Sequence, residues 1–382
     1  MLNQNSNSNQ NLTHSFIQVM STNQPSWGSI VYIDLNTPQY CVHECTLQFN
    51  LSGISNVSGG SQALTLPNLV PAFKFFTNIS ITNNNNILDS YDWMSNYLMN
   101  QLYTSYEDIQ FVNSGAGPYN SELVRYNMSN TNTTYQVPLK SFFSQLKPEI
   151  LNNNGNLRIA ISMESLSNII NTGTLLGTPI VTINSISALF KVSKYSDELA
   201  NAKLQQLLRA PILKTYNTIS YQPAIIPINT STISISLSNF VSLNIQFIYF
   251  VIRPSASLTR SNAFNLTPIT NFNIISSTGE SLTSGVITSA QSLYIFNRSL
   301  TLGCFTTDQN GYGNVYTCFH TSDAISKITQ MGGVYGSKLY SGSESLVINM
   351  PITTAQMNLD IYASTTSVFK QNQNSSFVKL VV

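Results

Sequence analysis

The histidines and cysteines are the residues of this chain with the most specific chemistry. There are three histidines and four cysteines in 382 residues. A zinc site could be assembled from Cys41, His43, Cys45, Cys318 and His320. The spacing fits no standard pair of zinc ligands, and both segments have strand-like surroundings. We therefore expect buried structural cysteines rather than a metal site.

Acidic residues occur in three close pairs, and each pair is a candidate for acid–base chemistry. No partner base accompanies any of them in the sequence. Solvated loops and a helix N-terminus account for such pairs without invoking catalysis. The pairs are Glu107 with Asp108, Asp89 with Asp92, and Asp197 with Glu198.

Motifs for nucleotides and for acyl transfer are missing from the sequence. It contains neither a G-x-S-x-G elbow nor a G-x-x-x-x-G-K-[ST] loop. Gly115 with Gly117, and Gly311 with Gly313, lack the third glycine of a dinucleotide site, so we interpret them as turns. We expect no enzyme, and no catalytic, cofactor-binding or metal-binding residues.

The composition describes a folded chain with very few charges. Hydrophobic residues make up 42% of the sequence and charged residues only 9%, against about 25% in ordinary soluble domains. The chain has 19 Tyr and 19 Phe, which favours packed cores over disorder. Its formal net charge of +1 argues against general or sequence-specific binding of nucleic acid. A surface with few charges tolerates close packing against copies of itself.

The sequence shows no sign of secretion or of a membrane helix. Residues 1–10 are polar, so we expect no secretory signal. The longest apolar run, residues 245–252, is far shorter than the roughly 20 residues that a membrane helix needs. Sequons such as the one at Asn78 are expected by chance in so Asn-rich a chain. We expect a soluble protein made inside a cell.

Most of the chain outside residues 196–209 shows the alternating pattern of short strands. Residues 47–51, 157–163 and 233–237 alternate apolar and polar side chains, and residues 243–252 are apolar on both faces. Many short strands joined by loops of uneven length favour antiparallel sandwiches. Helical spacing also appears in residues 89–102 and 322–330. The polar stretches 105–134 and 276–289 are candidates for outward-facing loops.

A helix-like segment at residues 196–209 divides the chain into two halves. Ser196 is a suitable N-cap, and Pro211 ends the segment. With 382 residues, two domains are the prior expectation. We predict a flexible N-terminal arm over 1–26, a first β domain over 27–195, a linker helix over 196–211 and a second β domain over 212–382.

Four stretches, in this order, resemble the double jelly-roll major capsid proteins of the adenovirus–tectivirus lineage. The closer likeness is to those of polinton-like viruses, virophages and nucleocytoplasmic large DNA viruses. The stretches are residues 64–73 (LTLPNLVPAF) with the strand and Asn turn that follow, residues 137–143 (VPLKSFF) with strand 157–163, the linker helix with the strand 247–253 (FIYFVIR), and residues 335–382.

The resemblance implies an all-β fold of two tandem eight-stranded antiparallel jelly rolls joined by a short helix. It also implies a major capsid protein of the virion, assembled inside the host cell as pseudo-hexameric homotrimers that tile an icosahedral shell. Implied partners are other copies of the chain, penton and minor capsid proteins, and an inner membrane. The alternative is a β-rich viral spike or carbohydrate- or receptor-binding adhesin, which would not need the central helix.

Overall fold

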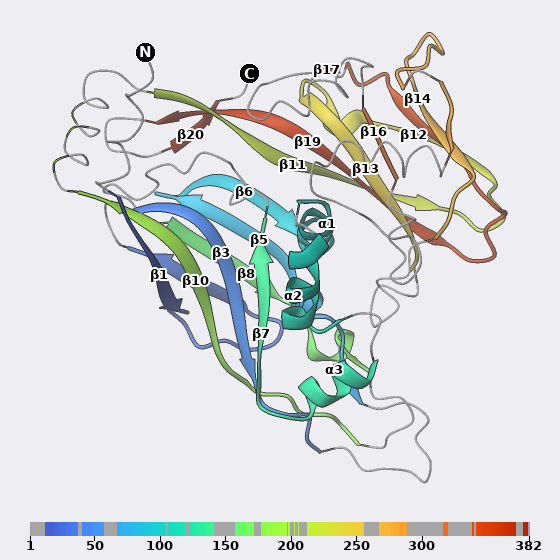
Figure 1. Ribbon diagram of the computed structural model, residues 1–382. Coiled ribbons are helices and arrows are strands. Elements are labelled where there is room, and N and C mark those ends of the chain that lie inside the picture. The colour runs from blue at the N-terminus through green and yellow to red at the C-terminus, as the bar shows by residue number, and fades with distance from the viewer. Residues whose placement is uncertain are drawn as a thin grey trace.

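In the computed structural model, more than half of the described residues lie in β-strands (Figure 1). The described residues are 12–36, 40–56, 67–103, 106–118, 122–140, 157–171, 177–196, 198, 202, 205, 212–255, 267–283, 285–288, 316–319, 338–339, 341–371 and 377–380.

The first half of the chain forms a sandwich of two four-stranded antiparallel sheets. Its strands are β1 (Leu12–Met20), β2 (Ile30–Leu35), β3 (Tyr40–Leu51), β5 (Phe76–Asn83), β6 (Asn86–Asp92), β7 (Thr133–Leu139), β8 (Leu157–Met163) and β10 (Ile183–Tyr195). Sheet I has the order β1-β10-β3-β7, and sheet II has the order β2-β8-β5-β6. The short strands β4 (Asn68–Leu69) and β9 (Ile170–Asn171) pair separately.

The second half forms a second sandwich of the same kind. Its strands are β11 (Ile212–Ile226), β12 (Thr232–Ser236), β13 (Asn244–Pro254), β14 (Asn271–Ile275), β15 (Ile287–Thr288), β16 (Tyr316–Phe319), β18 (Ser345–Asn349) and β19 (Met357–Gln371). Sheet III has the order β11-β19-β13-β16, and sheet IV has the order β12-β18-β14-β15. Sheet III is widened by β17 (Lys338–Leu339), which pairs with β13, and by β20 (Phe377–Leu380), which pairs with β19.

The two sandwiches repeat one strand order. If the eight main strands of each half are counted in chain order, the sheets are 1-8-3-6 and 2-7-4-5 in both halves. Sheet I therefore corresponds to sheet III, and sheet II to sheet IV. Sequence identity between the halves is not apparent, so only the pairing topology reveals this duplication.

Alternation along the strands builds each core, as the sequence predicts. In β8, Leu157, Ile159, Ile161 and Met163 are buried, while Arg158 on the opposite face is exposed. Strand β13 is an interior strand of sheet III, and Ile248 to Ile252 are buried on both of its faces. A strand covered on both sides needs apolar residues at every position, which explains its unbroken run.

The expectation of a flexible arm over residues 1–26 is wrong for Leu12–Met20. These residues form β1, which pairs antiparallel with β10 along its whole length. Because β1 is the first of the eight strands, the first sandwich begins before residue 27. Ile17 and Val19 pack against the core, whereas Phe16 points outward. The polar residues on both sides of this strand obscured its alternating pattern in the sequence.

Three helices between β6 and β7 correct the sequence interpretation. The predicted helix in residues 89–102 is α1 (Trp93–Tyr103), and it starts only after β6 ends. Residues 105–134, predicted as a loop, contain α2 (Tyr106–Ala116) and α3 (Glu122–Ser129). Gly115 belongs to α2, while Gly117 makes the expected turn with a φ of +87°. Short 3-10 turns are Ala72–Phe75, Leu166–Asn168 and Ser238–Phe240.

Several predicted features lie largely or wholly outside the described residues. Of the predicted linker helix, the structure describes Ser196 and, as helical and exposed, Glu198, Ala202 and Gln205. Residues 322–330, His320 and the Gly311–Gly313 pair are not described. Within 276–289, Ile287–Thr288 form β15. No helix in the described part of the chain has the length and apolar character needed to span a membrane.

Candidate functional site: the joint between the sandwiches

Of the five residues of the candidate zinc site, the structure describes the side chains of His43 and Cys45, and these two lie on opposite faces of sheet I. Cys45 is buried in the first core, while His43 lies on the opposite, outer face of sheet I. There its imidazole contacts the hydroxyl of Ser193, which also contacts His14 at 2.7 Å. The described residues contain no group of three or more His, Cys, Asp or Glu side chains placed to hold a metal ion.

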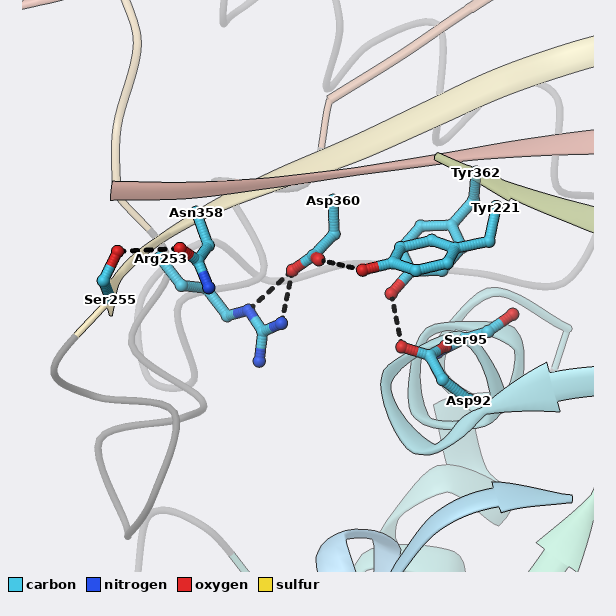
Figure 2. Close-up of polar contacts among 8 residues, drawn as sticks. All are labelled: Asp92, Ser95, Tyr221, Arg253, Ser255, Asn358, Asp360 and Tyr362. Carbon is cyan, nitrogen blue, oxygen red and sulfur yellow. Dashed lines mark hydrogen bonds and ion pairs between the residues drawn. The ribbon is translucent and has the colours of Figure 1, made fainter. Parts of the chain in front are cut away.

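Asp92, predicted to lie in a solvated loop, is instead half-buried where the two sandwiches meet (Figure 2). It ends β6 and caps α1, because its Oδ1 accepts a hydrogen bond from the Ser95 backbone N–H at 2.9 Å. Its Oδ2 accepts a second bond, at 3.0 Å, from the Tyr362 hydroxyl of β19. One carboxylate therefore fixes a helix start in the first sandwich to a strand of the second.

Three tyrosines from neighbouring strands of sheet III stack in a row at this joint. Tyr221, Tyr362 and Tyr249 come from β11, β19 and β13 and stand opposite one another in the strand register. The Tyr362 ring is stacked on both neighbours, with centroid distances of 5.1 Å to each. Because Tyr362 and Tyr249 are fully buried, the row fixes the position of the hydroxyl that reaches Asp92.

A buried ion pair continues the joint beside the tyrosines. Asp360 accepts a hydrogen bond from the Tyr221 hydroxyl at 2.7 Å and one from Arg253 Nε at 3.0 Å, and it also contacts the Arg253 Nη2. Both charged side chains are almost fully buried. The Arg253 guanidinium lies 5.3 Å from the centroid of the Trp93 ring, in the first sandwich. The arginine thus links sheet III to the start of α1.

A second buried ion pair approaches the same tryptophan from the first sandwich. Lys74 Nζ lies 3.2 Å from Glu164 Oε2 and 4.7 Å from the centroid of the Trp93 ring. Burial lowers the pKa of Lys74, while the neighbouring Glu164 opposes that shift. Trp93 is therefore contacted by one cation from each sandwich.

Burial also changes the proton affinity of Asp92. Loss of hydration raises its pKa from 3.8 to about 6, and the nearby Asp360 carboxylate adds to the increase. The Ser95 N–H, the Tyr362 hydroxyl and Arg253 oppose the shift. The joint therefore holds a carboxylate that titrates in mildly acidic solution.

The joint also has an apolar part that unites the sandwiches. Tyr249, Val251, Tyr362 and Phe369 of sheet III belong to the hydrophobic cluster of the first sandwich. Tyr249, Val251 and Tyr362 lie on the outer face of sheet III, which is the face turned away from sheet IV. The opposite face carries apolar residues of the second core, namely Ile248, Phe250, Ile252, Leu359 and Ile361. Sheet III is thus covered on both sides.

Two signals in the sequence could have identified these residues. Asp92 precedes the helical spacing of Met94 and Leu98 and stands three residues before Ser95, which is the position of an N-cap. Arg253 ends an apolar strand, where a charge needs a buried partner. The partner Asp360 lies 107 positions away, and the sequence does not reveal that pairing.

Solved structures with the same architecture match this chain over almost its full length. The PBCV-1 protein VP54, fitted into a reconstruction of the virophage Sputnik, has a TM-score of 0.70 and 11% identity, covering 97% of this chain and 96% of that chain. The major capsid protein of Faustovirus has a TM-score of 0.64 and 9% identity, covering 96% and 92%. The mavirus major capsid protein has a TM-score of 0.55 and 10% identity, covering 96% and 90%.

The chain has the double jelly-roll fold. The strand order of each half and the alignment over both halves agree on this point, and they confirm the predicted fold class. No protein-family model and no curated protein matches the sequence. At such low identity, the double jelly roll is what the chain shares with these structures. The joint is then the contact between its two jelly rolls.

Proposed function

We propose that this chain is the major capsid protein of an icosahedral virus and acts as a structural component of the virion. The supporting observation is the match to viral capsid structures along both jelly rolls, with more than nine-tenths of each chain covered for VP54 and the Faustovirus protein. A spike or a carbohydrate- or receptor-binding adhesin would not need the order of two jelly rolls that this chain has. The role is structural rather than enzymatic.

The proposed assembly unit is a homotrimer in which six jelly rolls surround one axis. Two similar jelly rolls per chain give three chains a pseudo-hexagonal outline, which suits the tiling of a shell. The low content of charged side chains, 9%, reduces repulsion between the many identical neighbours of such a shell. Penton proteins, minor capsid proteins and an inner membrane stay predictions from the resemblance.

Expression of the full chain tests this proposal. Light scattering measures the mass of the purified particle, and negative-stain electron microscopy shows its outline. We expect a mass of three chains, a hexagonal outline, and shells or sheets of capsomers at high protein concentration. A chain that stays monomeric under all conditions and binds glycans on an array would overturn the proposal in favour of an adhesin.

A further inference from the structure

Lys74, Glu164 and Asn168 form one cluster at an end of the first jelly roll, beside the joint. Lys74 lies in the 3-10 turn Ala72–Phe75, which leads into β5. Asn168 ends the 3-10 turn that follows β8. Because β5 and β8 are neighbours in sheet II, their ends bring the two turns together. Glu164 directly follows β8, and its backbone N–H donates to the last carbonyl of the first turn at 2.9 Å.

The carboxylate of Glu164 contacts both nitrogen-bearing side chains. Its Oε2 lies 3.2 Å from Lys74 Nζ, and its Oε1 accepts a hydrogen bond from Asn168 Nδ2 at 3.0 Å. The Ser165 backbone N–H also donates to Oε1, at 2.9 Å, and so fixes the carboxylate. An amine and a side-chain amide are therefore held at the two oxygens of one carboxylate, an arrangement that lowers the entropic cost of a reaction between them.

The surroundings of the amine favour its neutral, nucleophilic form. The side chains of Lys74 and Glu164 are only 6% and 11% exposed, and the centroid of the Trp93 ring lies 4.7 Å from Lys74 Nζ. Burial lowers the pKa of Lys74, and the Arg253 guanidinium adds to the decrease, whereas Glu164 opposes it. A desolvated lysine amine attacks carbonyl carbons readily, and the exclusion of water protects it from competing hydrolysis.

We propose that Lys74 and Asn168 form an isopeptide bond inside the first jelly roll, with Glu164 as the group that transfers the proton. Glu164 takes a proton from the Lys74 ammonium, and the neutral Nζ attacks Asn168 Cγ. The Nζ–Cγ bond then replaces the Cγ–Nδ2 bond. Glu164 gives the proton to the leaving Nδ2, which its Oε1 already contacts.

This reaction needs no co-reactant, because its atoms and charges balance within the cluster. Of the three protons on the Lys74 ammonium, one stays on the new amide and two leave with Nδ2. Ammonium is released, and Glu164 is again a carboxylate. The bond joins the turn before β5 to the turn after β8, and closing such a long loop restricts the unfolded chain. The modification goes beyond the proposed function and does not depend on it.

Mass spectrometry of the denatured wild-type chain tests the bond. We expect a mass about 17 Da below that of the sequence, which corresponds to the loss of one ammonia molecule. Peptic peptides that contain Lys74 and Asn168 should occur joined in one branched species that carries this loss. A folded wild-type chain that keeps the full mass of its sequence after prolonged incubation overturns the inference. A loss of ammonia without the branched species also overturns it, because a succinimide at an asparagine has the same mass.

Three variants show whether the cluster itself makes the bond. Lys74→Arg and Glu164→Gln should each keep the full mass of their sequences, because they remove the nucleophile and the proton-transferring group. Lys191→Arg is the matched control, since Lys191 also pairs with a glutamate but is 43% exposed, and this variant should still lose ammonia. A branched species in Lys74→Arg or Glu164→Gln would overturn the inference. If either variant fails to fold, the wild-type mass still decides the question.

Discussion

At the scale of single residues, the joint depends on charges that are buried and fully engaged. Arg253 and Asp360 form the most buried of the described ion pairs, and Asp360 also accepts a bond from Tyr221. Removing one member of such a pair leaves an uncompensated charge, which costs more than the intact pair contributes. Buried pairs therefore specify how two surfaces fit, even where they add little net stability.

Arg253→Met should lower the free energy of unfolding by about 3–5 kcal/mol, because Asp360 stays buried without its cation. Urea denaturation followed by circular dichroism measures this change. The control is Arg158→Met, which removes the exposed pair between Arg158 and Asp34 and should cost about 1 kcal/mol or less. Equal effects of the two substitutions would contradict the role assigned to Arg253.

Asp92 should make the stability of the chain fall as the pH rises. Its folded-state pKa of about 6 exceeds its ordinary value of 3.8, so the folded chain holds the extra proton between these limits. The contribution of Asp92 to the free energy of unfolding is therefore largest below pH 3.8 and is lost as the pH rises through about 6. The change amounts to about 3 kcal/mol for a shift of two pKa units.

Comparison with Asp92→Asn isolates this contribution. The difference in unfolding free energy between the variant and the wild type should grow in favour of the variant from about pH 4 to about pH 7. Urea denaturation at several pH values measures it. Glu44→Gln on the exposed outer face of sheet I is the control. A difference that stays constant with pH would show that Asp92 does not titrate as described.

At the scale of elements, β1 is the strand that the sequence concealed. Ile17→Asp should lower the free energy of unfolding by about 3 kcal/mol or more, because Ile17 packs on the first core. Phe16→Asp, one residue away on the outer face, should change the stability of the monomer by no more than about 0.5 kcal/mol. Urea denaturation at low protein concentration compares them. If neither substitution changed the free energy of unfolding, residues 12–20 would act as a flexible arm and not as a strand that packs on the core.

The linker helix stays a prediction, and it concerns residues that lie mostly outside the described ones. Glu198, Ala202 and Gln205 are exposed, at spacings that place them along one helical face. We expect Leu204 and Leu207 on the opposite face to hold the jelly rolls together. Changing both to Gln should lower the yield of trimers measured by size-exclusion chromatography, whereas Ala202→Gln should not. An unchanged yield for the double variant would contradict this role.

At the scale of the whole molecule, the shared core should make the two jelly rolls unfold together. Tyr249, Val251 and Tyr362 of the second jelly roll are fully buried against the first. We expect one transition in differential scanning calorimetry of the wild-type chain. Tyr362→Ala removes the central ring of the tyrosine row and the bond to Asp92, so it should split the transition into two.

Phe272→Ala is the control for this experiment. Phe272 is buried inside the second jelly roll, where its ring contacts that of Phe250. Its loss should destabilise that jelly roll by about 3–5 kcal/mol without removing any contact of the joint. Two separate transitions in the wild-type chain would contradict a shared core.

The sequence by itself determined the all-β class, the division near residue 196 and the strands with clear alternation. These features follow from local periodicity, because burial of one sheet face dictates the side chain at every second position. The resemblance of four stretches added the double jelly-roll order. β1 and the helices α2 and α3 escaped prediction, since their polar residues obscured the periodic pattern.

Only the tertiary structure decided what Asp92, Arg253 and Asp360 do. Asp92 and Asp360 lie on strands of different jelly rolls, more than 260 positions apart, and no local pattern connects them. Their burial arises when the outer face of sheet III packs against the first jelly roll. The same packing covers the outer face of sheet III, whereas the corresponding face of sheet I carries the exposed side chains of Phe16 and Met20.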